Sequence, residues 1–251
     1  MNYQQFAGLY DRLMEDAPYD MWVSFFRNAI DRYGINNTLD VLDVGCGTGE
    51  ISVRLGLEGY HVQGIDLSEE MLAVARKKAE NHDLEIPFFQ QDMRELEGFS
   101  NLDAAIIFCD SLNYLPTIED VKVTFERIAH TLKDDGLFMF DVHSLYKIEE
   151  VFGNETFTLN EEEISYIWEC HQGAKAGSIH HDLSFFVQEK ESVYNRYDES
   201  HYQITYPMDT YVHLLKDAGF EVCSITSDFS DREPDEQTER LFFIAKKIQK
   251  G

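Results

Sequence analysis

Three glycines spaced two residues apart form the part of this sequence best suited to ligand binding. Gly45, Gly47 and Gly49 follow an acidic residue, Asp43. Glycine adopts backbone conformations with φ > 0 and lets a ligand approach the main chain without a Cβ in the way. An apolar run precedes the glycines and a helical pattern begins near Thr48. The turn is therefore expected to present free N–H groups and the positive end of a helix to a ligand.

The spacing of these glycines distinguishes between cofactors. Dinucleotide-binding turns follow G-x-G-x-x-G, in which the third glycine packs the helix against the strand. This sequence has G-x-G-x-G, and Asp43 two positions before the first glycine disfavours a phosphate. A cofactor with an amino-acid end and a ribose fits better, and an NAD-dependent oxidoreductase remains a distant alternative.

Carboxylates recur at the ends of the apolar stretches that follow. Asp66 ends a second predicted strand about 20 residues beyond the glycines, where such folds hold a ribose diol. Asp92 ends a third stretch, and Asp110 and Asn113 follow a fourth. An Asp at a strand end is often only a cap or turn residue. Its fixed distance from the glycine turn favours a ligand contact for Asp66.

This series of segments resembles the class I S-adenosylmethionine-dependent methyltransferases, whose first motif is D/E-x-G-x-G-x-G. The resemblance implies S-adenosylmethionine as the cofactor, with Asp66 on its ribose and the acidic turn of Asp92 at its adenine. The residues expected at the cofactor are Tyr10, Trp22, Asp43, Gly45, Cys46, Gly47, Gly49, Asp66, Leu67, Met71, Gln91, Asp92, Met93, Asp110 and Asn113. Leu67, Met71 and Met93 could equally be ordinary apolar core residues.

The catalytic candidates are His143, Tyr10 and Tyr114. Methyl transfer from a sulfonium is an in-line displacement, so the enzyme supplies proximity, orientation and removal of a proton where the acceptor needs it. His143 directly follows the fifth predicted strand and is the first choice for a base. The alternative for His143 is a hydrogen-bonded turn histidine. Tyr10, with Trp22, is expected to close over the methionine end of the cofactor.

Two histidine-containing pairs raise the question of a metal site: Cys170-His171 and His180-His181. Adjacent residues in a strand face opposite sides of a sheet, so neither pair can present both side chains to one ion. Solvated or substrate-lining histidines are the preferred interpretation, and we expect no metal.

The charge of the chain limits its partners. It has 47 acidic and 21 basic residues in 251, a net charge of −26. Proteins that bind nucleic acids neutralise phosphates with Lys and Arg, and no basic stripe is visible here. We therefore expect no DNA partner and disfavour RNA, although a local basic patch remains open.

Cysteine usage and hydropathy indicate a cytoplasmic protein. The four cysteines are widely separated and form no C-x-x-C pair, which argues for reduced thiols. No apolar run is long enough to span a membrane, and the N-terminal residues lack the basic and apolar regions of an export signal. Cytoplasmic localisation without a membrane partner is the expectation.

The element pattern predicts one α/β domain with an insertion. Residues 1–38 read as a helical lead-in, and strands and helices alternate over 39–143, the cofactor-binding core. Period-two alternation in 144–206 predicts a small antiparallel sheet inserted after strand five, and 207–251 complete the core. With the resemblance, the fold class is a Rossmann-like doubly wound sheet of seven strands, the last antiparallel.

Within the larger family, the layout resembles small-molecule N-methyltransferases that act on amino sugars attached to nucleotides. The shared features are the Tyr10-Asp11 pair, the runs L-S-E-E-M-L and Q-D-M-R, and the insertion. Methyl transfer to a small polar acceptor, with an amine as the candidate, is the expected function. The alternatives are a tRNA or protein acceptor, or a non-catalytic cofactor-binding regulatory protein.

The aromatic residues of the insertion have two interpretations. They are Tyr166, Trp168, Phe185 and Tyr197. They could form a wall of an acceptor pocket that orients a small substrate. They could instead form the insertion's own core or the interface of a homodimer, and the sequence does not decide between these.

Overall fold

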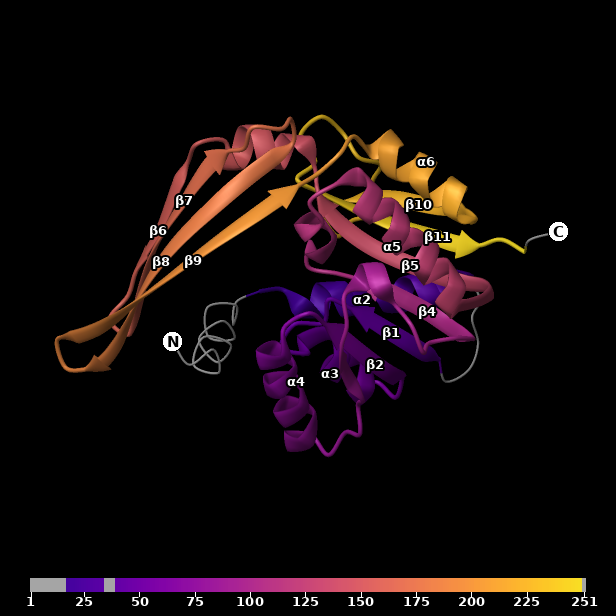
Figure 1. Ribbon diagram of the computed structural model, residues 1–251, viewed down its shortest axis with the longest axis horizontal. Coiled ribbons are helices and arrows are strands. Elements are labelled where there is room, and N and C mark those ends of the chain that lie inside the picture. The colour runs from indigo at the N-terminus through magenta and orange to yellow at the C-terminus, as the bar shows by residue number, and fades with distance from the viewer. Residues whose placement is uncertain (1–16, 34–38, 250–251) are drawn as a thin grey trace.

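The computed structural model describes residues 17–33 and 39–249, and a seven-stranded sheet forms its centre (Figure 1). The strands run in the order β10-β11-β5-β4-β1-β2-β3. Strands β1 to β5 are parallel, and β11 is antiparallel to both its neighbours, β10 and β5. The strand bounds are β1 Asp40–Val44, β2 His61–Asp66, β3 Phe88–Gln90, β4 Leu102–Ile107, β5 Leu132–His143, β10 Phe220–Ser227 and β11 Arg240–Lys247. The predicted doubly wound sheet with an antiparallel last strand is confirmed.

Five α-helices and three short helical turns surround this sheet in the described ranges. They are α2 Tyr19–Tyr33, α3 Glu50–Leu57, α4 Glu69–Asn81, α5 Ile118–Thr131, α6 Met208–Ala218, η1 Met93–Glu95, η2 Ser111–Tyr114 and η3 Lys147–Phe152. The capping signals in the sequence explain several boundaries. Ser68 and Thr117 accept the N–H groups of Met71 and Asp120 as N-caps of α4 and α5. Gly219 ends α6 in the left-handed conformation, as glycine often does.

The apolar core lies on both faces of the sheet. On one face, Phe125 of α5 and Tyr211 of α6 pack with Phe138 and Phe140 of β5. On the other face, α2 and α3 cover the strands with a separate cluster that includes Phe26. Burial on both faces explains why the central strands are nearly continuous apolar runs.

A second sheet of four antiparallel strands projects from one end of the molecule as a long arm (Figure 1). Its strands, in the order β6-β7-β8-β9, are β6 Thr156–Asn160, β7 Ile164–Gln172, β8 Ser178–Lys190 and β9 Val193–Ile204. These strands lie within the predicted insertion. The sequence predicts this sheet from a period-two alternation in β7, formed by Ile164, Tyr166, Trp168 and Cys170.

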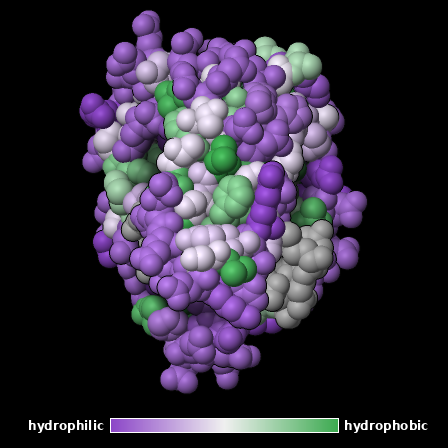
Figure 2. Space-filling view, turned by 90° about the vertical axis from the view of Figure 1, so that its left-hand side faces the viewer, coloured by the Kyte–Doolittle hydropathy of each residue, from purple (hydrophilic) through white to green (hydrophobic). Residues whose placement is uncertain are grey.

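Strand register divides this arm into two faces. We call the inner face the side that carries Trp168, His181 and Gln203. The outer face carries His171 and His180, which pair directly. Figure 2 views the molecule from the end where the arm lies and shows mostly hydrophilic side chains around a broken central patch of apolar ones.

The topology fixes where a ligand can bind. The direction of winding reverses between β1 and β4, and ligands of such sheets bind beyond the carboxyl ends of the strands at that point. The loops after β1 and β4 meet there, because Ser111 Oγ donates to the carbonyl oxygen of Gly45 at 3.2 Å. In the described ranges 17–33 and 39–249, no helix is both long and apolar enough to cross a membrane.

Candidate active site

The loop after β1 needs its glycines for different reasons. Gly45, Gly47 and Gly49 all have positive φ, at 73°, 53° and 78°. A Cβ added at Gly49 would lie 2.9 Å from the Cβ of Ala75 in α4, so this glycine permits close packing of the helices. A Cβ at Gly47 would meet no described atom within 4 Å, so the open side of the loop lies there. Helix α3 begins at Glu50, two residues later than expected, because Gly49 is its left-handed N-cap.

Asp66 lies beside that open side, at the end of β2. Its Oδ2 accepts the N–H of Gly47 at 2.8 Å, and its Oδ1 accepts the N–H of Ser68 at 2.9 Å. Burial raises the pKa of Asp66, and these backbone donors oppose that effect. The carboxylate is thus fixed next to the glycine turn, and its contact with a ribose remains a prediction.

Asp43 and Cys46 support the loop from beneath. Asp43 is buried and accepts a hydrogen bond from Ser52 Oγ at 2.5 Å, which ties β1 to α3. Burial raises the pKa of Asp43 to about 7. The Cys46 side chain packs with Val53 and Phe88, so only its backbone remains for a cofactor. The expected contact of these two residues with the cofactor remains a prediction, to which Cys46 can contribute backbone groups.

The residues expected at the adenine line the neighbouring edge. Leu67 is 65% exposed, and Met93 packs beside Gly45. Asp92 caps η1, and Arg94 Nε binds its two carboxylate oxygens at 2.9 and 3.1 Å. This ion pair lowers the pKa of Asp92. The side chain of Gln91 is held by backbone groups of Glu97, and Met71 lies half-buried in the first turn of α4.

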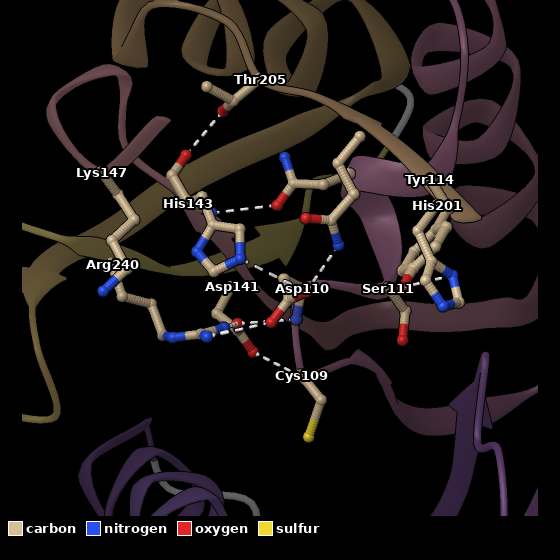
Figure 3. A network of polar contacts seen from close by, with 12 residues as sticks. Cys109, Asp110, Ser111, Tyr114, Asp141, His143, Lys147, His201, Thr205 and Arg240 are labelled. Atoms are coloured by element: carbon tan, nitrogen blue, oxygen red, sulfur yellow. Dashed lines mark hydrogen bonds and ion pairs between the residues drawn. The ribbon is translucent and has the colours of Figure 1, made fainter. Parts of the chain in front are cut away.

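A buried ionic cluster holds the loop after β4. Asp141 of β5 is fully buried and accepts the backbone N–H groups of Cys109 and Asp110 at 2.9 and 3.0 Å. Arg240, the first residue of β11, binds Asp141 and also donates to Asp110 Oδ1 at 2.9 Å (Figure 3). Burial opposes ionisation of Asp110, but His143 and Arg240 outweigh it and hold the pKa of Asp110 below its ordinary value.

His143 ends β5 next to this cluster. Its side chain is buried, with 6% of the residue exposed, and its Nε2 lies 3.4 Å from Asp110 Oδ2 (Figure 3). The same oxygen, Asp110 Oδ2, also accepts a hydrogen bond from Nε2 of Gln203 in β9 at 2.8 Å. His143 Nδ1 has no hydrogen-bond partner within the part of the chain that the structure describes.

Two of the residues expected at the cofactor, Trp22 and Asn113, are buried in the interior of the protein. The indole N–H of Trp22 donates to Asp141 Oδ1 at 2.7 Å inside the core, so Trp22 supports the β4 loop and does not face the crevice. Asn113 is buried and binds Ile204 and the backbone N–H of His143, each at 2.9 Å, which uses both ends of its amide. The sequence predicts both residues at the cofactor. The burial of polar groups that need partners explains the difference.

Of the two tyrosines proposed for catalysis, one can be placed. Tyr114 is half exposed, and its hydroxyl lies 3.5 Å from His201 Nδ1 on the inner face of the arm (Figure 3). Tyr10 lies outside the described residues. The role expected for Tyr10 remains a prediction.

The aromatic residues of the insertion pack against each other. Phe185, Tyr166 and Tyr197 belong to one cluster of the arm, and Trp168 packs with Phe152 of η3 in another. They all lie on the inner face with His181. They therefore contribute to the insertion's own core, while Tyr166, Trp168 and Tyr197 stay only partly buried on the face of the arm that reaches Asp110.

The histidine pairs behave as the strand geometry predicts. Cys170 and His181 share the inner face, with Sγ 3.3 Å from Nδ1, whereas His171 and His180 face outward. Among the residues of 17–33 and 39–249, no group of three or more His, Cys, Asp or Glu side chains could hold a metal ion.

The sequence did not reveal three important residues, Asp141, Gln203 and Arg240, and it raised His181 only in connection with a metal site or a solvated or substrate-lining position. None belongs to a recognisable motif. One signal could have indicated Arg240. An antiparallel last strand begins at the edge of the sheet where the parallel strand beside it ends, and the register indeed pairs Arg240 of β11 with His143 of β5. Gln203 and His181 required knowledge of how the insertion folds back.

This geometry is that of a Rossmann-like fold, with a glycine turn, a carboxylate fixed beside that turn and a polar centre at the strand ends. Residues 41–136 match a family model described as a methyltransferase domain. The chain is 53% identical over 98% of its length to a protein of Geobacillus sp. strain WCH70 that carries a methyltransferase name without a stated acceptor. The match covers 100% of that protein.

Two further comparisons agree. A Bacillus subtilis protein, also named only as a methyltransferase, is 49% identical over 98% of both chains. The crystal structure of an S-adenosylmethionine-dependent methyltransferase from Clostridium acetobutylicum has a TM-score of 0.89 at 29% identity, covering 99% of this chain and 100% of that one. The chain belongs to the class I S-adenosylmethionine-dependent methyltransferases, and its cofactor is S-adenosylmethionine.

Proposed function

We propose that this enzyme transfers the methyl group to a small polar acceptor, with an amine as the leading candidate. The observation that carries the proposal is His143, whose Nε2 faces Asp110 while Nδ1 is a buried atom without a hydrogen-bond partner among the described residues. A bound acceptor that reaches Nδ1 would supply the missing hydrogen bond. A neutral imidazole oriented by a carboxylate can accept a proton on its free nitrogen. An ammonium acceptor must lose a proton before its lone pair can attack the methyl carbon.

The arm supports a small acceptor over a macromolecule. The base of its inner face lies against the loop after β4, where Gln203 contacts Asp110 and His201 contacts Tyr114. That face combines aromatic rings with polar tips, a composition typical of small-molecule sites. The net charge of −26 disfavours RNA.

Solved structures with the same layout motivate the choice of probes. An amino pentose methyltransferase from Micromonospora echinaspora, solved with bound cofactor, has a TM-score of 0.77 and covers 95% of this chain and 96% of its own. Its identity of 17% shows a shared fold alone. Because the layout of the sequence resembles enzymes that act on amino sugars attached to nucleotides, we would test such amino sugars first.

The test measures where a labelled methyl group goes. We would incubate the protein and S-adenosylmethionine with a panel of small amines, including nucleotide-linked amino sugars, and in parallel with fractionated tRNA and with protein. We expect label in the small-amine fraction. His143→Asn should lower the rate by a factor of about 10² or more, the usual size of general-base catalysis, without weakening cofactor binding. Label confined to tRNA or protein, or no transfer despite cofactor binding, would contradict the proposal.

A further inference from the structure

A chain of three hydrogen bonds joins the inserted arm to the polar centre. Trp168 Nε1 of β7 donates to His181 Nδ1 of β8 at 3.0 Å. His181 Nε2 lies 3.2 Å from Gln203 Oε1 of β9, and Gln203 Nε2 donates to Asp110 Oδ2 at 2.8 Å. Figure 3 shows the Asp110 end of this chain beside His143.

The chemistry of its members fixes the direction of the chain. An indole N–H can only donate, so His181 Nδ1 must accept and Nε2 must carry the proton. His181 therefore donates to the carbonyl oxygen of Gln203, and the amide nitrogen of Gln203 faces Asp110. A carboxylate can only accept, so the last bond runs in the same direction. Burial lowers the pKa of His181 to about 4, which keeps this ring neutral near neutral pH.

Packing makes the chain rigid. His181 is 5% exposed and Gln203 is 3% exposed. The rings of His181 and His143 both stand edge-to-face against Phe152 of η3, with centroids 5.1 and 5.4 Å away. Because the two histidines share this neighbour, the arm and the strand end are held at a fixed spacing.

The chain ends on the oxygen that faces the proposed base. Asp110 Oδ2 accepts from Gln203 at 2.8 Å and lies 3.4 Å from His143 Nε2, while Arg240 binds Oδ1. Both oxygens are therefore held, so the carboxylate cannot turn away from His143. A hydrogen-bond acceptor such as Asp110 Oδ2 beside Nε2 favours the imidazole tautomer that carries its proton on Nε2. Nδ1 is then left without a proton.

We propose that Gln203 and His181 are positioning residues of the methyl-transfer centre. Through them, the inserted arm fixes the orientation of Asp110 and thereby the Nε2–H tautomer of His143. This inference rests on the proposed function, in which His143 Nδ1 receives the proton of the acceptor.

The direct test reads the histidine tautomers by NMR of the full-length protein labelled with ¹⁵N-histidine. In the unmodified protein, we expect His143 and His181 each to be protonated at Nε2 only. Gln203→Leu should convert His143 to a mixture of tautomers and leave the affinity for S-adenosylmethionine unchanged. A single, unshifted Nε2–H tautomer of His143 in a folded Gln203→Leu protein would overturn the inference.

Two further variants keep the test decisive. His181→Phe preserves a ring against Phe152 but cannot bind Gln203, so it should also release the tautomer of His143. His181→Gln retains a donor toward Gln203 and should restore the single tautomer. Gln188→Leu, on the same sheet near the end of β8, is the matched control and should change nothing. Unchanged His143 signals in His181→Phe would overturn the inference.

Kinetics separate positioning from a merely structural role. With an acceptor from the amine panel, Gln203→Leu should lower kcat about 10-fold or more at unchanged KM for S-adenosylmethionine. A rise in the cofactor KM at unchanged kcat would contradict a positioning role. If no small amine is methylated, the proposed function fails, whereas the tautomer measurements still decide the link between Gln203 and His143.

Discussion

Asp66 is the residue on which cofactor affinity should depend most. Its carboxylate is held by the N–H groups of Gly47 and Ser68 beside the open side of the glycine turn. Asp66→Ala removes charge-assisted hydrogen bonds to a ribose and should cost about 1.5–3 kcal/mol, or about 10- to 150-fold in affinity. Calorimetry with S-adenosylmethionine measures this change. Asp182→Ala, on the exposed arm, is the control, and an unchanged Kd for Asp66→Ala would remove Asp66 from the site.

His181 should make stability depend on pH in a defined window. Burial holds its folded-state pKa near 4, below the ordinary 6.5, so the unfolded chain takes up the proton first. The contribution of neutral His181 to the free energy of unfolding is complete above pH 6.5 and is lost as the pH falls through 4. The loss amounts to at most about 3 kcal/mol. Cys170, His143, Asp110 and His201 also face this ring or act on it.

The measurement for this prediction is the difference in the free energy of unfolding between the unmodified protein and His181→Phe. Subtracting the variant removes the contributions of the other titrating groups. The difference should be flat above pH 6.5 and should shrink below it. A difference that does not vary with pH would show that His181 is not buried in its neutral form.

At the scale of single residues, the sequence predicted that Asp66 and His143 stand at strand ends, and their roles in the site remain predictions. Asp66 could be placed because the glycine turn fixes its distance, and His143 because it ends an apolar strand. Trp22 and Asn113 were expected at the cofactor but lie in the interior, since a lone polar side chain in the sequence does not show which buried partner it meets. Gln203 was missed for the same reason.

At the scale of elements, two glycines of one turn should respond differently to the same substitution. Ala at either Gly47 or Gly49 must adopt positive φ, at a cost of roughly 1–2 kcal/mol. At Gly49 the added Cβ also meets Ala75 at 2.9 Å, whereas at Gly47 it points into open space. Gly49→Ala should therefore lower the melting temperature more, and Gly47→Ala should weaken cofactor binding more. Equal effects on both quantities would contradict the separate roles.

The far half of the arm should serve the acceptor alone. Replacing residues 186–196 with a tight turn shortens β8 and β9 beyond the pair of Phe185 and Tyr197 but retains Gln203. We expect unchanged affinity for S-adenosylmethionine and a raised KM for the acceptor. Loss of cofactor binding in a folded variant would refute this division. Removing all of 144–206 is a poorer test, because it also deletes the partners of Asp110 and Asn113.

Element boundaries were predictable where local chemistry sets them. Ser68 and Thr117 are N-caps and Gly219 is a C-cap, and these residue types favour such positions in any helix. Alternation in β7 predicted the inserted sheet. How far the arm folds back over the strand ends was not predictable, since that depends on contacts between residues distant in the sequence, such as the bond between Gln203 and Asp110, 93 positions apart.

At the scale of the molecule, one topological feature completes the site. The first five strands place Gly45, Asp66, Asp110 and His143 at one edge, as parallel strands must. The antiparallel β11 begins at that same edge and brings a cation, Arg240, to a cluster otherwise acidic. The charge of −26 could be read from the sequence, but this single compensating arginine required the fold.

The most direct test of the account is a crystal structure with S-adenosylhomocysteine, the product of methyl transfer, bound. The ribose hydroxyls should bind Asp66, and the sulfur should point toward the space between His143 and the inner face of the arm. That result would place the methyl group beside the proposed base. A sulfur directed away from both His143 and the arm would contradict the account, even with the ribose on Asp66.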